Sequence, residues 1–313
     1  MRPFSRCCLA AVALLAAAPV AVPAAEALPP ASYLAACGGA DAVIPLGETL
    51  LDWQCLRTAH PQIHCLRADA QGRLWLELAD GRRVLYDEGL PLDPHGPPRW
   101  DGDVRASMAR PYPLDPHRPP TPAGDSPGRR RSYALLRALY GDSAAAVRPR
   151  LRTGTFFGQR VQMEARALEA LQRVEARLAP EVARQPALRA YLVSAGGFLW
   201  RRIAGEDRLS PHSFGIAIDL SPQKAPYWRW SRRRPHPLQS AYPTAIVSAF
   251  EAEGFVWGGK WHEYDLMHFE FRPEILCKAR RAATPPDAAP SAAPDFPSSA
   301  LPSPALPASP APR

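Results

Sequence analysis

Hydrophobic residues recur every three to four positions in three parts of this chain, a spacing that predicts helices. The clearest case is 165–178, where Leu168, Leu171 and Leu178 fall on one side and Pro180 is expected to end the helix. Shorter helices are predicted at 130–140 and 242–253. Each of these segments offers one apolar face to a core.

Alternating hydrophobic and polar residues predict strands elsewhere. Residues 73–78 and 83–86 alternate on either side of Asp80-Gly81, and an Asp-Gly pair between two such runs is a strong hairpin signal. Further strands are predicted at 156–157 and 161–163 across a glycine, and at 188–194, 216–220, 255–257 and 267–271. Because strands and helices are mixed without a regular strand–helix–strand repeat, we expect an α+β fold with a small mixed or antiparallel sheet and flanking helices.

Composition divides the chain into segments. The end of the chain is almost wholly Ala, Pro and Ser, which cannot bury enough apolar surface to offset the entropy of ordering. Proline also dominates about 91–127, and because it fixes φ and lacks an N–H, this stretch is expected to be extended. We assign a leader at 1–27, a small β-rich region at 28–100, a proline-rich connector at 101–129, the main α+β domain at 130–281 and a disordered tail at 282–313.

The first residues have the pattern of a secretory signal peptide. Arg2 and Arg6 precede an apolar stretch at 7–22, and Ala25-Glu-Ala27 offers small residues for cleavage. The apolar stretch is short for a membrane span, although an N-terminal anchor is the alternative. We therefore expect a periplasmic or secreted protein, without stable membrane insertion and monomeric.

Export makes the cysteines candidates for disulfides. Two lie in the leader, and the remaining four are an even number in an oxidising compartment. Two disulfides with three possible pairings follow. Pairing Cys55 with Cys65 closes a small loop and leaves Cys37 to join Cys277.

The charge is strongly basic but does not choose a partner by itself. The net charge is +8, carried almost wholly by arginine. Aromatic and basic residues are interleaved at 227–234, a mixture that can bind nucleic acid. In an exported protein we expect no nucleic acid, and interpret this stretch as a groove for glycan or peptide or as a solvated rim.

Two short segments contain the side chains of a catalytic zinc site. His212 and Asp219 lie seven residues apart around Gly215, which lets the backbone turn closely beneath a metal. His268 can supply a third ligand at the start of a strand. Three protein ligands leave a fourth position open, the mark of catalytic rather than structural zinc. The sequence therefore predicts Zn²⁺ held by these three residues.

The same segments offer a base and several cations. Asp265 lies three residues before His268, where it can reach a zinc-activated water, take its proton and pass it to a leaving amine. Glu270 shares the strand face of His268 and is the competing base. The candidate cations for the oxyanion or for a substrate carboxylate are Arg201, Arg202 and Arg208.

A serine nucleophile is the main competing chemistry. Ser221-Pro-Gln-Lys224 has the S-x-x-K form of penicillin-binding proteins. No S-D-N is present, and the nearest match to K-T-G, Arg152-Thr-Gly154, precedes the serine instead of following it. We interpret the match as chance.

The zinc-site segments resemble a known family. Ser210-Pro-His-Ser-Phe-Gly-Ile-Ala-Ile-Asp219 fits the S-x-H-x-x-G-x-A-x-D pattern of the D-alanyl-D-alanine carboxypeptidase metallopeptidases, and 255–271 is similar to their second signature. The group includes L-alanyl-D-glutamate endopeptidases and shares its fold with the hedgehog signalling domain. The resemblance implies a zinc metallopeptidase domain at 130–281, His212, Asp219 and His268 as ligands, and Asp265 as base.

The resemblance also implies a substrate class. The family cleaves peptidoglycan peptides, so we expect a carboxypeptidase that hydrolyses amide bonds of stem peptides, with Arg201 closest to the family's upstream arginine. A cell-wall endopeptidase of the L-Ala-D-Glu type is the first alternative. A non-catalytic cell-wall-binding module that keeps a zinc site is the second, and an intact base at Asp265 argues against it.

Overall fold

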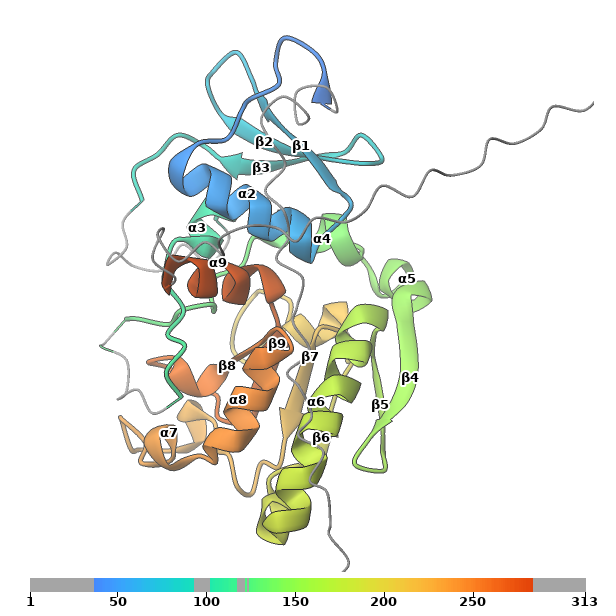
Figure 1. Cartoon of the computed structure of the whole chain (residues 1–313), viewed down its shortest axis with the longest axis vertical. Coiled ribbons are helices and arrows are strands. Elements are labelled where there is room, and N and C mark those ends of the chain that lie inside the picture. Colours follow the sequence, from blue (N-terminus) through green and yellow to red (C-terminus); the bar gives the residue numbers. More distant parts are fainter. Residues whose placement is uncertain (1–36, 93–101, 117–121, 123, 284–313) are drawn as a thin grey trace, which may run out of the picture.

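The computed structural model describes residues 37–92, 102–116, 122 and 124–283. The predicted leader and nearly all of the predicted tail lie outside the described residues. The described chain combines helices with small antiparallel sheets, which confirms the α+β prediction (Figure 1). None of its helices has the length and apolar character needed to span a bilayer.

The N-terminal region contains a helix and a three-stranded sheet of order β1-β2-β3. The predicted hairpin is confirmed, with Gly81 in its turn at a φ of +82°. The helix escaped prediction because its apolar and polar residues are not sorted onto two faces, and it even buries Asp52. The elements are α2 (Gly47–Ala59), β1 (Ile63–Ala68), β2 (Leu74–Leu78) and β3 (Arg83–Asp87).

The proline-rich stretch packs against the core and is not extended throughout. It contains a short helix, α3 (Val104–Met108). Beyond it, the buried Tyr112 donates a hydrogen bond from its hydroxyl to Glu251 (2.6 Å) and accepts one from the Trp257 N–H (2.9 Å). Lys260 Nζ donates to the carbonyl of Pro113 (2.6 Å). These hydrogen bonds attach the segment around Tyr112 to the main domain.

The main domain begins with helices and a hairpin. The predicted hairpin is confirmed, but Pro180 does not end the helix that follows it: the helix runs on for four residues. Leu178 and the buried Val182 continue its apolar stripe, while Pro180 and Ala176, whose carbonyl the proline leaves without a helical donor, are exposed to water. The elements are α4 (Tyr133–Tyr140), α5 (Ala144–Val147), β4 (Leu151–Phe156), β5 (Gln159–Glu164) and α6 (Ala165–Arg184).

A four-stranded antiparallel sheet of order β6-β7-β9-β8 forms the centre. The strand predicted at 188–194 is wrong: Pro186–Ala190 form a 3₁₀ turn that buries only Leu188. The strands are β6 (Ser194–Gly196), β7 (Ala217–Leu220), β8 (Phe255–Trp257) and β9 (His268–Phe271). The helices that complete the domain are α7 (Leu238–Ala241), α8 (Thr244–Ala252) and α9 (Pro273–Ala283).

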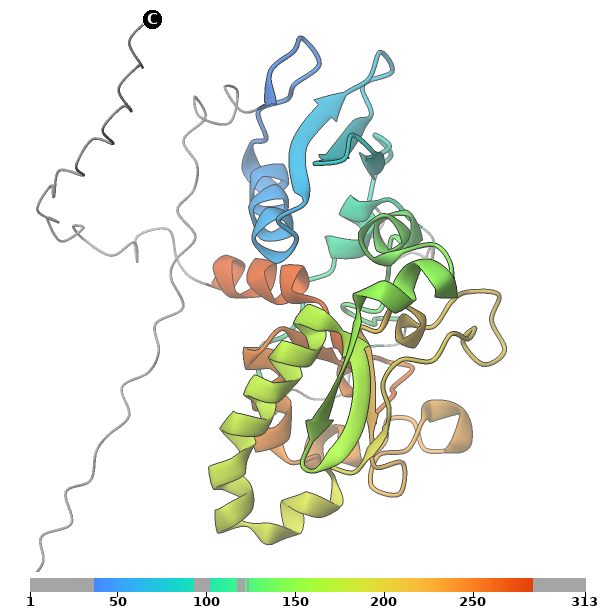
Figure 2. The ribbon, with the colours of Figure 1, turned by 90° about the vertical axis from the view of Figure 1, so that its right-hand side faces the viewer.

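The helices leave one side of this sheet open to loops. Helix α6 packs against α8 and against the β4–β5 hairpin. Figure 2 shows α6 on one side of the domain and the long loop after β6 on the other. Helix α9 lies against α2 of the N-terminal region, so it joins the two parts of the protein (Figure 1).

Both disulfides differ from the pairing described above. Cys37 is bonded to Cys65, and Cys55 is bonded to Cys277 across 222 residues. Because α2 packs on α9, the buried Cys55 lies beside Cys277 and not beside its near neighbour in sequence. The second disulfide therefore fastens the N-terminal region to the end of the main domain.

Buried charges also join these two parts. Glu274 at the start of α9 is fully enclosed and contacts Arg272 and His60, whose Nε2 lies 3.3 Å from the carboxylate. Burial raises the pKa of Glu274, but the Arg272 charge and the hydrogen bond with His60 outweigh it and lower the pKa to about 2. The carboxylate is therefore ionised in the folded protein.

The Glu274 carboxylate makes the stability of the folded protein depend on pH. A pKa lowered from 4.5 to about 2 corresponds, at about 1.4 kcal/mol per unit, to roughly 3 kcal/mol. That stabilisation is fully present above pH 4.5 and is lost as the pH falls toward 2. In urea unfolding, Glu274→Gln should be less stable than wild type at pH 7, and the difference should shrink below pH 4.5. Glu169→Gln, an exposed site on α6, should show no such difference. A Glu274→Gln difference independent of pH would contradict the assignment.

Candidate metal centre

Three structural elements bring the predicted ligands together. His212 lies in the 3₁₀ turn Pro211–Phe214, Asp219 in β7, and His268 at the first position of β9, directly opposite Asp219 in the sheet. Gly215 ends the turn in the left-handed conformation, at a φ of +71°. A Cβ there would lie 2.6 Å from Leu151 Cδ2, so only glycine lets the turn lie against the β4–β5 hairpin.

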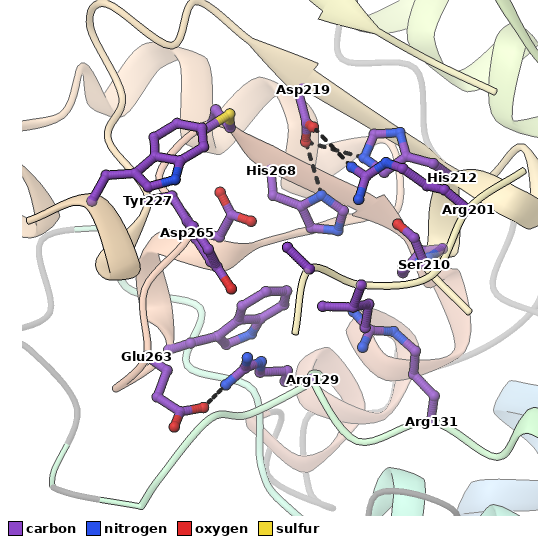
Figure 3. Close-up of a pocket in the computed structure, with 16 residues that line it drawn as sticks. Arg129, Arg131, Arg201, Ser210, His212, Asp219, Tyr227, Glu263, Asp265 and His268 are labelled. Atoms are coloured by element: carbon purple, nitrogen blue, oxygen red, sulfur yellow. Dashed lines mark hydrogen bonds and ion pairs between the residues drawn. The ribbon is translucent and has the colours of Figure 1, made fainter. Parts of the chain in front are cut away.

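The ligand atoms are close enough to share one ion. One donor atom from each of the three residues lies within 4.8 Å of the others. Asp219 Oδ1 is 3.2 Å from His212 Nε2 and 2.9 Å from His268 Nδ1 (Figure 3). Bonds of about 2.0–2.1 Å in a tetrahedral zinc site place neighbouring ligand atoms about 3.3 Å apart. The triad therefore already has nearly the spacing that zinc requires.

The ring of His212 is fixed in the tautomer that suits a metal. Its Nδ1 lies 2.7 Å from the Gly197 carbonyl, which can only accept, so Nδ1 carries the proton. Nε2 then keeps a free lone pair, and it is a buried atom without a hydrogen-bond partner among the described residues. A histidine that donates its second N–H to a carbonyl is the usual arrangement at protein metal sites.

His268 is oriented by two carboxylates. Its Nδ1 faces Asp219, and its Nε2 lies 3.5 Å from Glu270 Oε2. Burial lowers the pKa of His268, but the hydrogen bonds and charges of these carboxylates outweigh it and raise the pKa to about 9. The site thus favours positive charge, which a divalent cation would provide while the ring stays neutral. The donor set and its electrostatics both fit Zn²⁺.

Asp265 lies at the predicted place, just before β9. The His268 N–H donates to its carbonyl (3.1 Å), and its own N–H donates to Gly258 (3.0 Å). Its Oδ1 is buried without a hydrogen-bond partner among the described residues. Burial raises the pKa of Asp265 to about 6, with the Asp219 charge adding to the effect and nearby cations opposing it. A carboxyl that titrates near neutrality is suited to proton transfer.

Glu270 is held in ion pairs. It is completely buried, accepts from Arg131 Nε (2.9 Å) and lies 3.5 Å from Arg272 Nη1. Burial raises its pKa, but the Arg131 and Arg272 charges hold the pKa far below the usual range. Such a carboxylate is a weak proton acceptor, so its geometry favours orienting His268 over acting as a base.

The three candidate arginines have different surroundings. Arg201 lines the cavity over the triad, 4.0 Å from Asp219 Oδ2, and Ser213 Oγ accepts a hydrogen bond from its N–H (2.9 Å). Arg202 pairs with Asp207, and Arg208 with Glu206. Neither of these two lines the cavity.

The cavity also contains residues that the sequence did not suggest. It measures about 130 Å³, and Arg129 and Arg131 reach it from the segment before α4. Figure 3 shows Arg201 beside Asp219, and Arg129 on the opposite side beside Glu263. Arg129 also lies over the ring of Trp261, 5.7 Å from its centroid. The run of basic residues at 129–131 was the sole signal, and no motif links it to the site.

The structure also locates the aromatic and basic stretch at 227–234 and the serine motif at 221–224. Tyr227 and Trp230 line the cavity, which places part of the aromatic and basic stretch at its rim. Ser221 is buried, its hydroxyl faces Gln223, and neither it nor Lys224 lines this cavity. The serine motif therefore has no part in the candidate site.

One protein family matches the chain over this region. Residues 204–271 match the family described as D-alanyl-D-alanine carboxypeptidase. No curated protein and no solved structure matches the chain. The matched residues include His212, Asp219, Asp265 and His268. The segment that carries the candidate metal centre is therefore similar to the D-alanyl-D-alanine carboxypeptidase family.

Proposed function

We propose that this protein is a zinc-dependent peptidase that hydrolyses amide bonds in peptidoglycan stem peptides outside the cytoplasm. The carrying observation is one cavity that combines the His212, Asp219 and His268 triad with the carboxyl of Asp265, whose Oδ1 has no hydrogen-bond partner among the described residues. The family match supports a peptidase of the carboxypeptidase type. The two disulfides support an oxidising compartment.

The chain's own residues provide the remaining chemistry. His212, Asp219 and His268 would hold a zinc ion, which would act as a Lewis acid and lower the pKa of a water molecule. Asp265 takes a proton from the attacking water and returns it to the leaving amine, a role that its raised pKa suits. Arg201 lines the same cavity and would contact the carbonyl oxygen or a carboxylate of the substrate.

Cations on both sides of the triad favour a carboxypeptidase. Arg201 lies on one side and Arg129 on the other, so a peptide across the triad has a guanidinium near each end (Figure 3). A free terminal carboxylate needs such a partner. Cleavage inside a peptide, as by an endopeptidase, is the alternative.

Digestion of purified muropeptides tests the proposal. We expect wild type to release products, and chelation to abolish release until Zn²⁺ is restored. Loss of a C-terminal residue indicates a carboxypeptidase, and internal cleavage indicates an endopeptidase, both read from product masses. Activity that survives chelation would favour serine chemistry. No cleavage by folded, zinc-loaded protein would leave only a binding module.

A further inference from the structure

A second cavity adjoins the metal centre. It measures about 460 Å³ and shares Arg201 with the cavity over the triad. Its lining combines arginines with aromatic and apolar residues: Tyr133, Arg137, Trp200, Arg201, Arg202, Asp207, Arg208 and Leu209. Apart from Arg201, no residue of this lining has a role in the proposed reaction.

The lining is strongly positive. It contains four guanidinium groups and the carboxylate of Asp207, and one of the four, Arg208, is paired with Glu206 outside the lining. Asp207 and Arg202 form an ion pair, but their side chains are 94% and 62% exposed. Exposed pairs contribute little to stability, so an incoming anion can take over Arg202 at small cost. The cavity therefore attracts a negative group.

The arginines of this cavity lie on helix α4 and on the loop at 201–209. Arg137 is exposed on α4, whose N-terminus is capped by Ser132. Arg202 lies on a small hairpin loop, where it forms a bridge with Leu209, and the Ile203 N–H donates to the carbonyl of Arg208 (2.8 Å). Backbones held in this way lose little entropy when the side chains bind a ligand.

Two aromatic residues also line this cavity. Tyr133 is buried and donates from its hydroxyl to the Leu209 carbonyl (2.9 Å). Trp200 packs edge-on against Phe214, with ring centroids 6.4 Å apart. A lining that combines aromatic and apolar residues with arginines suits an anionic group carried on carbon, such as an acidic side chain, better than a bare phosphate chain.

We infer that this cavity is a subsite for a carboxylate of the acidic peptide whose amide bond lies at the metal centre. The inference rests on the proposed function, and it identifies the cavity that would bind the negative charge of the substrate. Arg201 borders both cavities, so one peptide can occupy both. The planar fork of arginine fits a carboxylate with two hydrogen bonds, and a carboxamide cannot replace that pairing.

Two synthetic peptides that differ only in a carboxylate or carboxamide beside the cleaved bond test this. Binding is measured by calorimetry to zinc-loaded Asp265→Asn protein, so that nothing is cleaved. We expect the carboxylate peptide to bind about tenfold more tightly, the effect of about one charge-assisted hydrogen bond. In the background of Arg137→Gln with Arg202→Gln the preference should fall below about twofold. Arg184→Gln, which removes a charge at the far end of α6, should keep it.

The possible outcomes separate the subsite from the reaction. A preference kept by the double variant, or an equal loss for both peptides, would overturn the subsite. Tighter binding of a poly(glycerol phosphate) than of the acidic peptide would also overturn it, in favour of an anionic polymer. If wild type cleaves neither peptide, the proposed function fails, while the binding preference still decides the subsite. If it cleaves both, KM and not kcat should carry the preference.

Discussion

Asp265→Asn should lower kcat on stem peptides by about 10²–10⁴-fold, the usual contribution of a general base. Asparagine keeps the shape of the side chain but cannot take a proton. The ligands are His212, Asp219 and His268, so zinc content should stay near that of wild type. The measurement is kcat together with bound zinc for both proteins.

The same carboxyl should set the acid side of the pH profile. Its pKa of about 6 means that the ionised form, which acts as base, is lost as the pH falls below about 6. A bound cation lowers that pKa further, so the activity should fall at or below pH 6. Asp142→Asn, an exposed site after α4, should keep both the rate and the profile. Loss of zinc in parallel with activity in Asp265→Asn would instead make Asp265 a ligand.

The placement of these residues was predictable because their spacing is local. The spacing of His212 and Asp219 around Gly215, and of Asp265 and His268 at the start of a strand, predicted the segments that carry the site. The structure adds that β7 and β9 are paired, with Asp219 opposite His268. Gly215 was expected to allow a close turn, and its left-handed φ allows one. Short-range geometry of this kind can be read from one sequence.

Features set by distant contacts were not predictable. Arg129 reaches the cavity because Tyr112 and the residues around it fasten the proline-rich stretch to the core, which no local pattern reveals. Cys55 pairs with Cys277 because α2 meets α9. Helix α2 itself lacks an apolar stripe, since its buried face includes Asp52. In each case tertiary packing decided what sequence spacing left open.

Replacing Glu270 should affect stability and zinc binding, whereas replacing Asp265 should affect catalysis. Glu270→Gln should destabilise the metal-free protein by about 3–5 kcal/mol, because it leaves Arg131 buried without its carboxylate. It should also weaken zinc binding by about 10–100-fold, because His268 loses a carboxylate that orients its ring. Urea unfolding and zinc titration measure the two effects.

A double-mutant cycle separates the ion pair from the site. The double variant Arg131→Met with Glu270→Gln removes both charges. It should therefore be destabilised by less than the sum of the two single variants. Glu169→Gln, exposed on α6, should change neither quantity. Once saturated with zinc, Glu270→Gln should turn over substrate within about tenfold of wild type, because Asp265 remains. If kcat of Glu270→Gln at full zinc occupancy fell as far as that of Asp265→Asn, Glu270 would be the base. If the changes in unfolding free energy were strictly additive, the charges of Glu270 and Arg131 would not depend on each other.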